Sequence, residues 1–248
     1  MRSTSSLGSS AKPGEAVRVG MRLFSLLPQR CLGCGVPSPQ PLCRLCQARF
    51  QPASPPDPGQ GRCPVCGQVL LAEARYCIDC SAQTWSFPSL DGLFSYQDPG
   101  AELLRLYKFG GLAALARSWA TAAAVRLIPA GPLVPVPPLR RNLWRRGWDP
   151  VQSFTRALGR STGLPVWKLL VRRSSLNQKT LDRSGRLENA RRAYTLPRSS
   201  ARLLGRKTPK VVWLIDDVVT TGATVEACSR LLKDAGAAEV RVLCVGLH

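Results

Sequence analysis

Acidic residues are scarce in this chain of 248 residues, where 15 Asp and Glu stand against 35 Lys and Arg and leave a formal net charge of +20. Long apolar runs are also missing, because the best candidate, 112–130, is interrupted by Arg117 and Arg126, and a spanning helix needs roughly 18 consecutive apolar residues. The apolar run 23–27 is too short for the core of a signal peptide. We therefore expect no membrane insertion and a cytoplasmic location.

Histidine is nearly absent as well, since the chain has a single one, His248. A Ser–His nucleophilic pair is therefore not available for catalysis. The hydrophobic fraction of 44% is too high for a disordered chain, and the length suits one or two domains. The positive charge indicates phosphate-bearing partners such as nucleic acid, anionic lipid or a small phosphorylated molecule, or else only a solvated surface.

Cysteine, in contrast, is concentrated near the start of the chain. Eight of the ten cysteines form four Cys-x-x-Cys pairs before residue 81. Two intervening residues let one tight turn aim both sulfurs at one tetrahedral ion, and Gly35 and Gly67 follow two of the pairs where a positive φ is needed. Disulfides or a redox site are the alternatives, but a redox Cys-x-x-Cys requires a strand-to-helix unit, and these pairs lie in turn-rich sequence. The pattern predicts two structural zinc ions.

The spacing of the pairs favours sequential grouping. Eight residues separate the first two pairs, ten separate the last two, and 16 lie between the second and the third. One site would then contain Cys31, Cys34, Cys43 and Cys46, and the other Cys63, Cys66, Cys77 and Cys80, although a crossed grouping stays open. Four sulfurs leave a zinc ion no open position, so the ions would be structural or support partner docking rather than catalysis. We interpret Cys228 and Cys244 as buried thiols.

The chain divides by composition into three parts. Residues 1–20 are predicted to be a disordered basic extension, 21–92 a double zinc-ribbon module with a linker at 51–61, and 93–248 an α/β domain. Alternating apolar patterns predict a parallel sheet covered by helices. The helices are expected over 102–109, 113–127, 150–162 and 223–235, and the strands over 133–136, 211–215 and 239–246.

One segment carries the sharpest chemical signal. The strand expected over 211–215 ends in Asp216 and Asp217, and a turn rich in hydroxyls and glycine then opens a helix. Backbone N–H groups at a helix start bind anions. Carboxylates repel anions, so the combination makes sense for a ligand that also carries hydroxyls, as a ribose 5-phosphate does. The alternative is an acidic strand end followed by a threonine helix cap. In the anion-site interpretation, the hydroxyls of Thr221 and Thr224 can donate further hydrogen bonds to the phosphate beside the backbone N–H groups.

This string resembles the ribose-phosphate loop of the type I phosphoribosyltransferases. The segments 133–137, 145–147 and 178–194 further resemble the ComF family, which joins an N-terminal cysteine-rich zinc module to a phosphoribosyltransferase-like domain. The resemblance runs from about residue 22 to residue 248. It implies a parallel five-stranded core with a hood that binds phosphoribosyl pyrophosphate and Mg²⁺.

The resemblance also implies roles for individual residues. Ribose hydroxyls would be held by Asp216 and Asp217, and the 5-phosphate by Thr220, Thr221, Gly222, Ala223 and Thr224. The pyrophosphate loop would be Pro135, Val136, Pro137 and Pro138, supported by the basic residues Arg140, Arg141, Arg145 and Arg146. A mobile arm would fold over the leaving group with Gln178, Leu181, Arg183, Arg186 and Asn189. The implied chemistry is displacement of pyrophosphate from the ribose C1 by a nitrogen nucleophile, a pentosyl transfer helped mainly by Mg²⁺ and arginines.

Three departures from the family pattern bear on specificity. The family usually follows Arg-Gly with Phe-Asn-Gln, where this chain has 148–150 as Trp-Asp-Pro. Gly185 stands where the arm usually carries a glutamate. Thr220 stands where purine-specific relatives carry an aspartate near the base, which disfavours purine salvage. The acceptor is not identified by the sequence, nor is turnover itself.

A second class of function is a non-catalytic binding protein. The ComF family is associated with natural competence, which would make a nucleotide, single-stranded DNA or DNA-uptake proteins the partners. Trp144 and Trp148 are interleaved with four arginines, and such a pattern can stack bases while neutralising phosphates. The alternative for the tryptophans is packing in the core.

Overall fold

The computed structural model describes residues 30–31, 34–39, 43–49, 63, 65, 70, 76–82, 84–95, 100–109, 113–173 and 190–247. The chain separates into two compact units, residues 1–49 and residues 50–248. Our boundary between residues 92 and 93 stays a prediction. The extension 1–20, the linker 51–61 and the arm residues between 178 and 189 lie outside the described residues.

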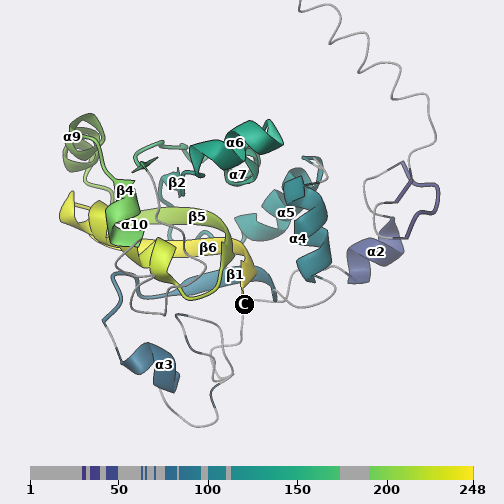
Figure 1. Cartoon of the computed structure of the whole chain (residues 1–248), viewed down its shortest axis with the longest axis horizontal. Coiled ribbons are helices and arrows are strands. Elements are labelled where there is room, and N and C mark those ends of the chain that lie inside the picture. Colours follow the sequence, from purple (N-terminus) through teal and green to yellow (C-terminus); the bar gives the residue numbers. More distant parts are fainter. Residues whose placement is uncertain are drawn as a thin grey trace, which may run out of the picture. The chain divides into compact units, whose positions relative to one another are not determined.

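A parallel sheet forms the centre of the second unit, as the sequence predicts (Figure 1). Its four strands lie in the order β1-β6-β5-β2, and every neighbouring pair is parallel. Beyond β2, Val166 forms a parallel bridge with Leu133, so the fifth position expected from the family resemblance contains a single bridging residue. The bounds are Leu90–Ser95 for β1, Leu133–Pro135 for β2, Val211–Val219 for β5 and Glu239–Leu247 for β6.

Helices cover both faces of this sheet, which confirms the predicted fold class. One face packs against α4, α5 and α7, and the other against α10. Sheets covered in this way are apolar on both sides, and the first six residues of β5 are all buried. The helical bounds are Gly100–Phe109 for α4, Leu115–Ala124 for α5, Arg140–Arg146 for α6, Pro150–Thr162 for α7, Arg198–Lys207 for α9 and Ala223–Asp234 for α10.

Smaller elements complete the described parts. The antiparallel pair β3 (Val171–Arg172) and β4 (Tyr194–Thr195) forms a second, two-stranded sheet. The short helix α3 (Ile78–Ser81) precedes β1 in the second unit, and α2 (Arg44–Arg49) belongs to the first unit. No helix in the described ranges combines the length and apolarity that crossing a membrane requires.

Strand β5 is longer than predicted, and this changes where the acidic pair lies. We expected the strand to end at Ile215, but backbone pairing with β6 continues through Val219, with Asp216 opposite Cys244 and Val218 opposite Gly246. The carboxylates therefore lie inside a strand, where successive side chains point to opposite faces. The helix expected over 113–127 is, in contrast, shorter in the structure, where α5 spans Leu115–Ala124. Strand β1 and the helices α6 and α9 are elements that the sequence did not reveal.

Candidate functional site

The sequence predicts an anion site at the turn between β5 and α10. Gly222 is the residue before the helix and has φ of 74°, and its carbonyl accepts the first helical hydrogen bond from Glu226 N at 2.8 Å. Among the described residues no side chain caps this helix. The first amides of a helix have no acceptor within it, and they attract negative charge together with the helix dipole. The amides concerned are those of Ala223, Thr224 and Val225.

A tryptophan that sequence reasoning missed covers one side of this turn. A Cβ atom added to Gly222 would lie 2.8 Å from Cζ3 of Trp85 and 3.0 Å from Cη2. The Trp85 indole donates its Nε1–H to the carbonyl of Cys80 at 3.0 Å. Glycine is thus required at 222 both for its left-handed backbone and for the close approach of the indole. The sequence signals the glycine but not its neighbour, 137 residues away.

The two carboxylates of the acidic pair lie on opposite faces of β5. Asp217 faces α4, where its Oδ2 lies 2.9 Å from Lys108 Nζ. Asp216 is 7% exposed and faces the side of α10, and its Oδ1 accepts a hydrogen bond from the backbone N–H of Asp217 at 2.8 Å. The two residues that sequence reasoning grouped together are adjacent along the chain but have different surroundings.

Burial determines the protonation of Asp216. Burial, with the nearby charge of Asp217, raises the pKa of Asp216 to about 8, against smaller opposing effects of the backbone hydrogen bond and of Lys108 and Arg172. The Arg172 guanidinium lies over the ring of Tyr194, 5.1 Å from its centroid. With a pKa of about 8, Asp216 holds a proton at neutral pH and offers an O–H donor, whereas the side chain of Asp217 is paired with Lys108.

Two of the residues that depart from the family pattern, Asp149 and Pro150, have a local structural role. Asp149 caps α7, since its Oδ1 accepts from Gln152 N at 3.0 Å, and Pro150 is the first helical residue. This is a favourable helix start, because aspartate accepts a free amide and proline has no N–H to leave unsatisfied. Burial raises the pKa of Asp149, and the charge of Asp217 adds to the effect. The hydroxyl of Tyr107 donates to the Pro150 carbonyl at 2.7 Å, which ties α4 to this helix start.

The predicted pyrophosphate loop begins next to the acidic pair. Pro135 pairs with Ile215 across the strands β2 and β5, and Val136 N donates to the Ile215 carbonyl at 2.9 Å. The loop therefore starts beside the residue that precedes Asp216. Val136 is buried, whereas Pro137 and Pro138 are half-buried.

The predicted basic patch forms the short helix α6 after this loop. None of the seven residues of α6, all described, is buried. The α6 surface consists of the exposed side chains Arg140, Arg141, Leu143, Trp144 and Arg145.

The two tryptophans of this region have different environments. Trp148 packs edge-on against Tyr107, with ring centroids 5.0 Å apart and an interplanar angle of 88°. Trp144 is 87% exposed. Core packing, one of the two interpretations from sequence, thus accounts for Trp148 but not for Trp144.

The predicted arm residues, Gln178, Leu181, Arg183, Arg186 and Asn189, lie outside the described residues. The chain on either side of them is described and forms the β3–β4 pair, with Arg173 N donating to the Ala193 carbonyl at 2.9 Å. The described residues that flank 174–189 therefore lie side by side in this pair.

The first cysteine cluster, Cys31, Cys34, Cys43 and Cys46, has the geometry of a metal site. Its four sulfurs all lie within 4.8 Å of one another, and Cys34 Sγ is 3.7 Å from Cys43 Sγ. A tetrahedral zinc ion with sulfurs at about 2.3 Å holds them about 3.8 Å apart, so the thiols fit such an ion. The N–H of Cys43 points at Cys31 Sγ from 3.2 Å, and Gly35 has the positive φ of 76° that the sequence predicts. The sequential grouping holds here.

The second cysteine cluster, Cys63, Cys77 and Cys80, brings three sulfurs within 4.8 Å of one another. Cys66, the fourth ligand predicted from the spacing, lies outside the described residues. All three clustered cysteines are buried and belong to the same apolar cluster as Phe87, Val219 and Ala223. This cluster is therefore packed into the α/β unit.

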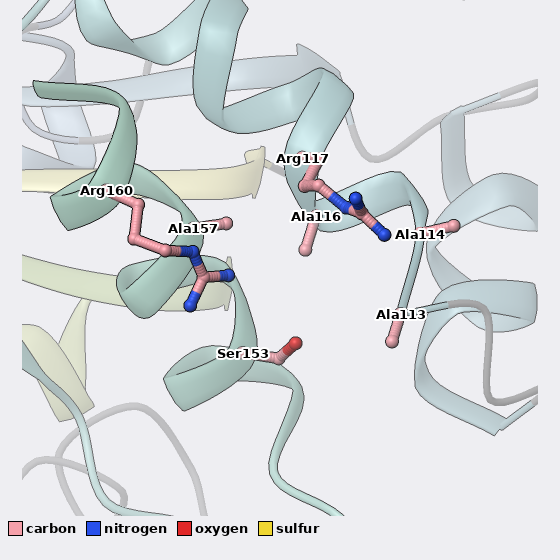
Figure 2. Close-up of a pocket in the computed structure, with 7 residues that line it drawn as sticks. All are labelled: Ala113, Ala114, Ala116, Arg117, Ser153, Ala157 and Arg160. Carbon is pink, nitrogen blue, oxygen red and sulfur yellow. The ribbon is translucent and has the colours of Figure 1, made fainter. Parts of the chain in front are cut away.

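A pocket of about 380 Å³ lies elsewhere, between α5 and α7 (Figure 2). Arg117 and Arg160 extend from these two helices beside a floor of alanines, and Ser153 adds a hydroxyl. None of the residues predicted from sequence lines it. Its full lining is Ala113, Ala114, Ala116, Arg117, Ser153, Ala157 and Arg160.

Comparisons with known proteins agree with the family resemblance. No family model matches the chain. The chain is 29% identical over 192 residues to competence protein F of Haemophilus influenzae, covering 73% of this chain and 82% of that protein. It is 27% identical over 206 residues to competence protein ComFC of Streptococcus pneumoniae, covering 81% and 84%. It is also 27% identical over 194 residues to DNA utilization protein YhgH of Escherichia coli K12, covering 74% and 82%.

Among solved structures, the chain is similar to the allosteric regulatory enzyme of purine biosynthesis at a TM-score of 0.33 and 18% identity. That match covers 52% of this chain and 25% of the enzyme chain.

Proposed function

Since the chain is a member of the ComF family, we propose that its α/β unit binds phosphoribosyl pyrophosphate, or a related nucleotide, together with Mg²⁺. The observation that carries the proposal is the uncapped start of α10 directly after the central strand β5, with Asp217 two residues before the strand ends. The 5-phosphate would bind the amides of Ala223, Thr224 and Val225. Hydroxyls of Thr221 and Thr224 would complete this cradle.

The acidic pair would serve the ribose from two different positions. Asp217 is half-buried near the carboxyl end of β5 and would accept hydrogen bonds from the ribose hydroxyls, while Lys108 would stay close enough to contact the anionic ligand. Protonated Asp216 would hold the strand end in place through its contact with Asp217 N. Carboxylate oxygens such as that of Asp217 are donors that Mg²⁺ prefers, and the ion would neutralise charge on the pyrophosphate.

The reaction class would be pentosyl transfer to a nitrogen acceptor. A nitrogen lone pair would form the bond to ribose C1 while the bond from C1 to the pyrophosphate oxygen breaks. Pyrophosphate would leave with the electron pair, and the acceptor nitrogen would release its proton to solvent. Arginines of α6 would stabilise the leaving group, since they follow the loop that starts beside β5.

The names of the relatives suggest the biological setting. Two are competence proteins and the third is a DNA utilization protein, so we propose a role in the handling of incoming DNA. We also propose that each cysteine cluster holds one structural zinc ion, with Cys66 as the fourth ligand of the second.

Calorimetric titration of the zinc-loaded full chain with phosphoribosyl pyrophosphate and Mg²⁺ tests the ligand. We expect saturable binding that is lost when Asp216→Asn and Asp217→Asn are combined. The matched control is Asp234→Asn, which changes an exposed carboxylate at the far end of α10 and should leave binding unchanged. Absence of binding to the wild-type chain would refute the proposal.

A second candidate function is binding of single-stranded DNA on the α6 surface. It is favoured by the 87% exposure of Trp144 within a helix that carries four arginines. The double Asn variant separates the two candidates. It should abolish ribose-phosphate binding, while affinity for a labelled oligothymidylate should persist or increase, because negative charge has been removed.

A further inference from the structure

The second cysteine cluster is connected through the side chain of Trp85 to the turn between β5 and α10, which we call the phosphate turn. The path begins at Cys80, whose carbonyl accepts the indole N–H of Trp85 at 3.0 Å. It ends at Gly222, where the same indole lies so close that an added Cβ would be 2.8 Å from a ring carbon. Phe87, which is buried, supports the indole from a ring-centroid distance of 5.4 Å.

Ser86, the residue after Trp85, holds the first turn of α10 through Glu226. Glu226 is 2% exposed, and both of its carboxylate oxygens accept from Ser86, one from the backbone N–H at 2.7 Å and one from the hydroxyl at 2.8 Å. Arg230 Nε approaches the same carboxylate only to 3.7 Å. A buried carboxylate loses much free energy if its donors are withdrawn, so Ser86 and the helix start depend on each other.

The cysteines hold the other end of this path. Cys77 precedes α3, and its carbonyl accepts from the N–H groups of Cys80 and Ser81 at 3.0 and 2.9 Å. Only four residues separate Cys80 from Trp85, and Cys63, Cys77 and Cys80 lie in one apolar cluster with Ala223, the first residue of α10. An ion bound by these cysteines would therefore fix the segment that leads to Trp85.

We propose that Trp85 and Ser86 are positioning residues for the phosphate turn, and that metal bound in the second cysteine cluster is required for the turn to bind phosphate. The ion would act through these residues, since the Trp85 indole contacts both Cys80 and Gly222. The first cysteine cluster, which belongs to the other unit, would have no such effect. The ligand part of this inference rests on the proposed function, whereas the ordering of the turn does not.

Paired cysteine variants of the full chain separate the two clusters. Native mass spectrometry should show that Cys77→Ser/Cys80→Ser has lost one zinc ion. This variant should bind phosphoribosyl pyrophosphate with Mg²⁺ at least tenfold more weakly. Without ligand, the backbone amides of 222–226 should exchange hydrogen with solvent faster than in the wild type. Cys31→Ser/Cys34→Ser should also lose one zinc ion but change neither binding nor exchange. Unchanged exchange at 222–226 after loss of the second ion, or a wild-type chain without metal in that cluster, would overturn the proposal.

A second set of variants leaves the cysteines intact. Trp85→Ala should keep both zinc ions and accelerate amide hydrogen exchange at 222–226 but not in the core of β5. Its affinity for phosphoribosyl pyrophosphate should fall at least tenfold, and Trp85→Phe should recover part of that affinity. Trp85→Ala with wild-type exchange would overturn the role of the indole. If the wild-type chain binds no phosphoribosyl pyrophosphate, the proposed function fails, while the exchange data still decide whether the second cluster orders the turn.

Discussion

The ammonium group of Lys108 lies 2.9 Å from the carboxylate of Asp217, joining the end of α4 to the strand that precedes the phosphate turn. The two side chains are only 17% and 18% exposed, so the pair is largely shielded from water. Asp149 is close enough for its pKa to respond to the charge of Asp217. Lys108 is therefore the ion-pair partner of Asp217, whereas the charge of Lys168 opposes the rise in the pKa of Asp149.

Removing the Lys108 ammonium group should destabilise the chain. Lys108→Met keeps the length of the side chain but leaves Asp217 partly buried and without its ion-pair partner, which should cost about 1–2 kcal/mol of the free energy of unfolding. Urea unfolding at pH 7 measures the loss. Lys233→Met, at an exposed position near the end of α10, is the matched control and should change stability by less than about 0.5 kcal/mol. Equal effects of the two substitutions would contradict the importance of the pair.

The protonation of Asp216 predicts a pH dependence of stability. Its folded-state pKa of about 8 lies above the value of about 3.9 that an unfolded chain has. Between these values the folded chain holds a proton that the unfolded chain has lost, so this residue makes the free energy of unfolding fall as pH rises from about 4 to about 8. The isosteric Asp216→Asn should remove this contribution.

Unfolding measured from pH 5 to pH 9 in both proteins isolates the effect of Asp216, because Asp91 and Asp149, whose pKa values are also raised, remain in both. The variant should gain stability relative to the wild type as pH rises and level off above about pH 8. Parallel pH profiles would show that Asp216 is ionised throughout.

The cap of α7 predicts an asymmetry between two substitutions at one position. Asp149→Ala removes the acceptor of Gln152 N and should lower the free energy of unfolding by about 1 kcal/mol. Asp149→Asn keeps an acceptor oxygen and should remain close to the wild type, since the two residues cap helices about equally well. Thermal unfolding compares the three proteins. A loss in Asp149→Asn as large as that in Asp149→Ala would indicate that the negative charge matters more than the cap.

Local patterns allowed accurate prediction where the cause was local. The bounds of α7 match the prediction because Asp149 and Pro150 start the helix and Gly163, with φ of 73°, ends it. The first cysteine cluster has the predicted grouping because spacing along the chain determines which thiols one ion can reach. The parallel sheet was predictable from the alternation of apolar strands with helices.

Features that depend on distant residues were not predictable. The extension of β5 through Asp216 and Asp217 depends on pairing with β6, and two carboxylates in sequence give no sign of it. The partner of Asp217 on α4 and the indole over Gly222 come from segments more than 100 residues away. Glycine at 222 was recognised from its turn, but a single sequence does not reveal which side chain fills the space beside it.

The exposed indole of Trp144 gives the sharpest test of nucleic-acid binding. Trp144→Ala should weaken binding of an oligothymidylate about fivefold or more, because stacking on one aromatic ring contributes about 1–3 kcal/mol per base. Its stability should be unchanged, since the side chain is 87% exposed. Ile128→Ala, at another exposed apolar position, is the control for loss of apolar surface and should bind as the wild type does.

The arginines beside Trp144 should act differently from the indole. Arg141→Ala should lower affinity and also reduce the slope of log affinity against log salt by about 0.7, the value for one phosphate contact on a single strand. Trp144→Ala should leave that slope unchanged, because stacking releases no counterions. Fluorescence anisotropy over a range of salt concentrations distinguishes the two effects. If Trp144→Ala bound as the wild type does at every salt concentration while Arg141→Ala lost affinity, the α6 surface would attract DNA by charge alone and the tryptophan would have no part in binding.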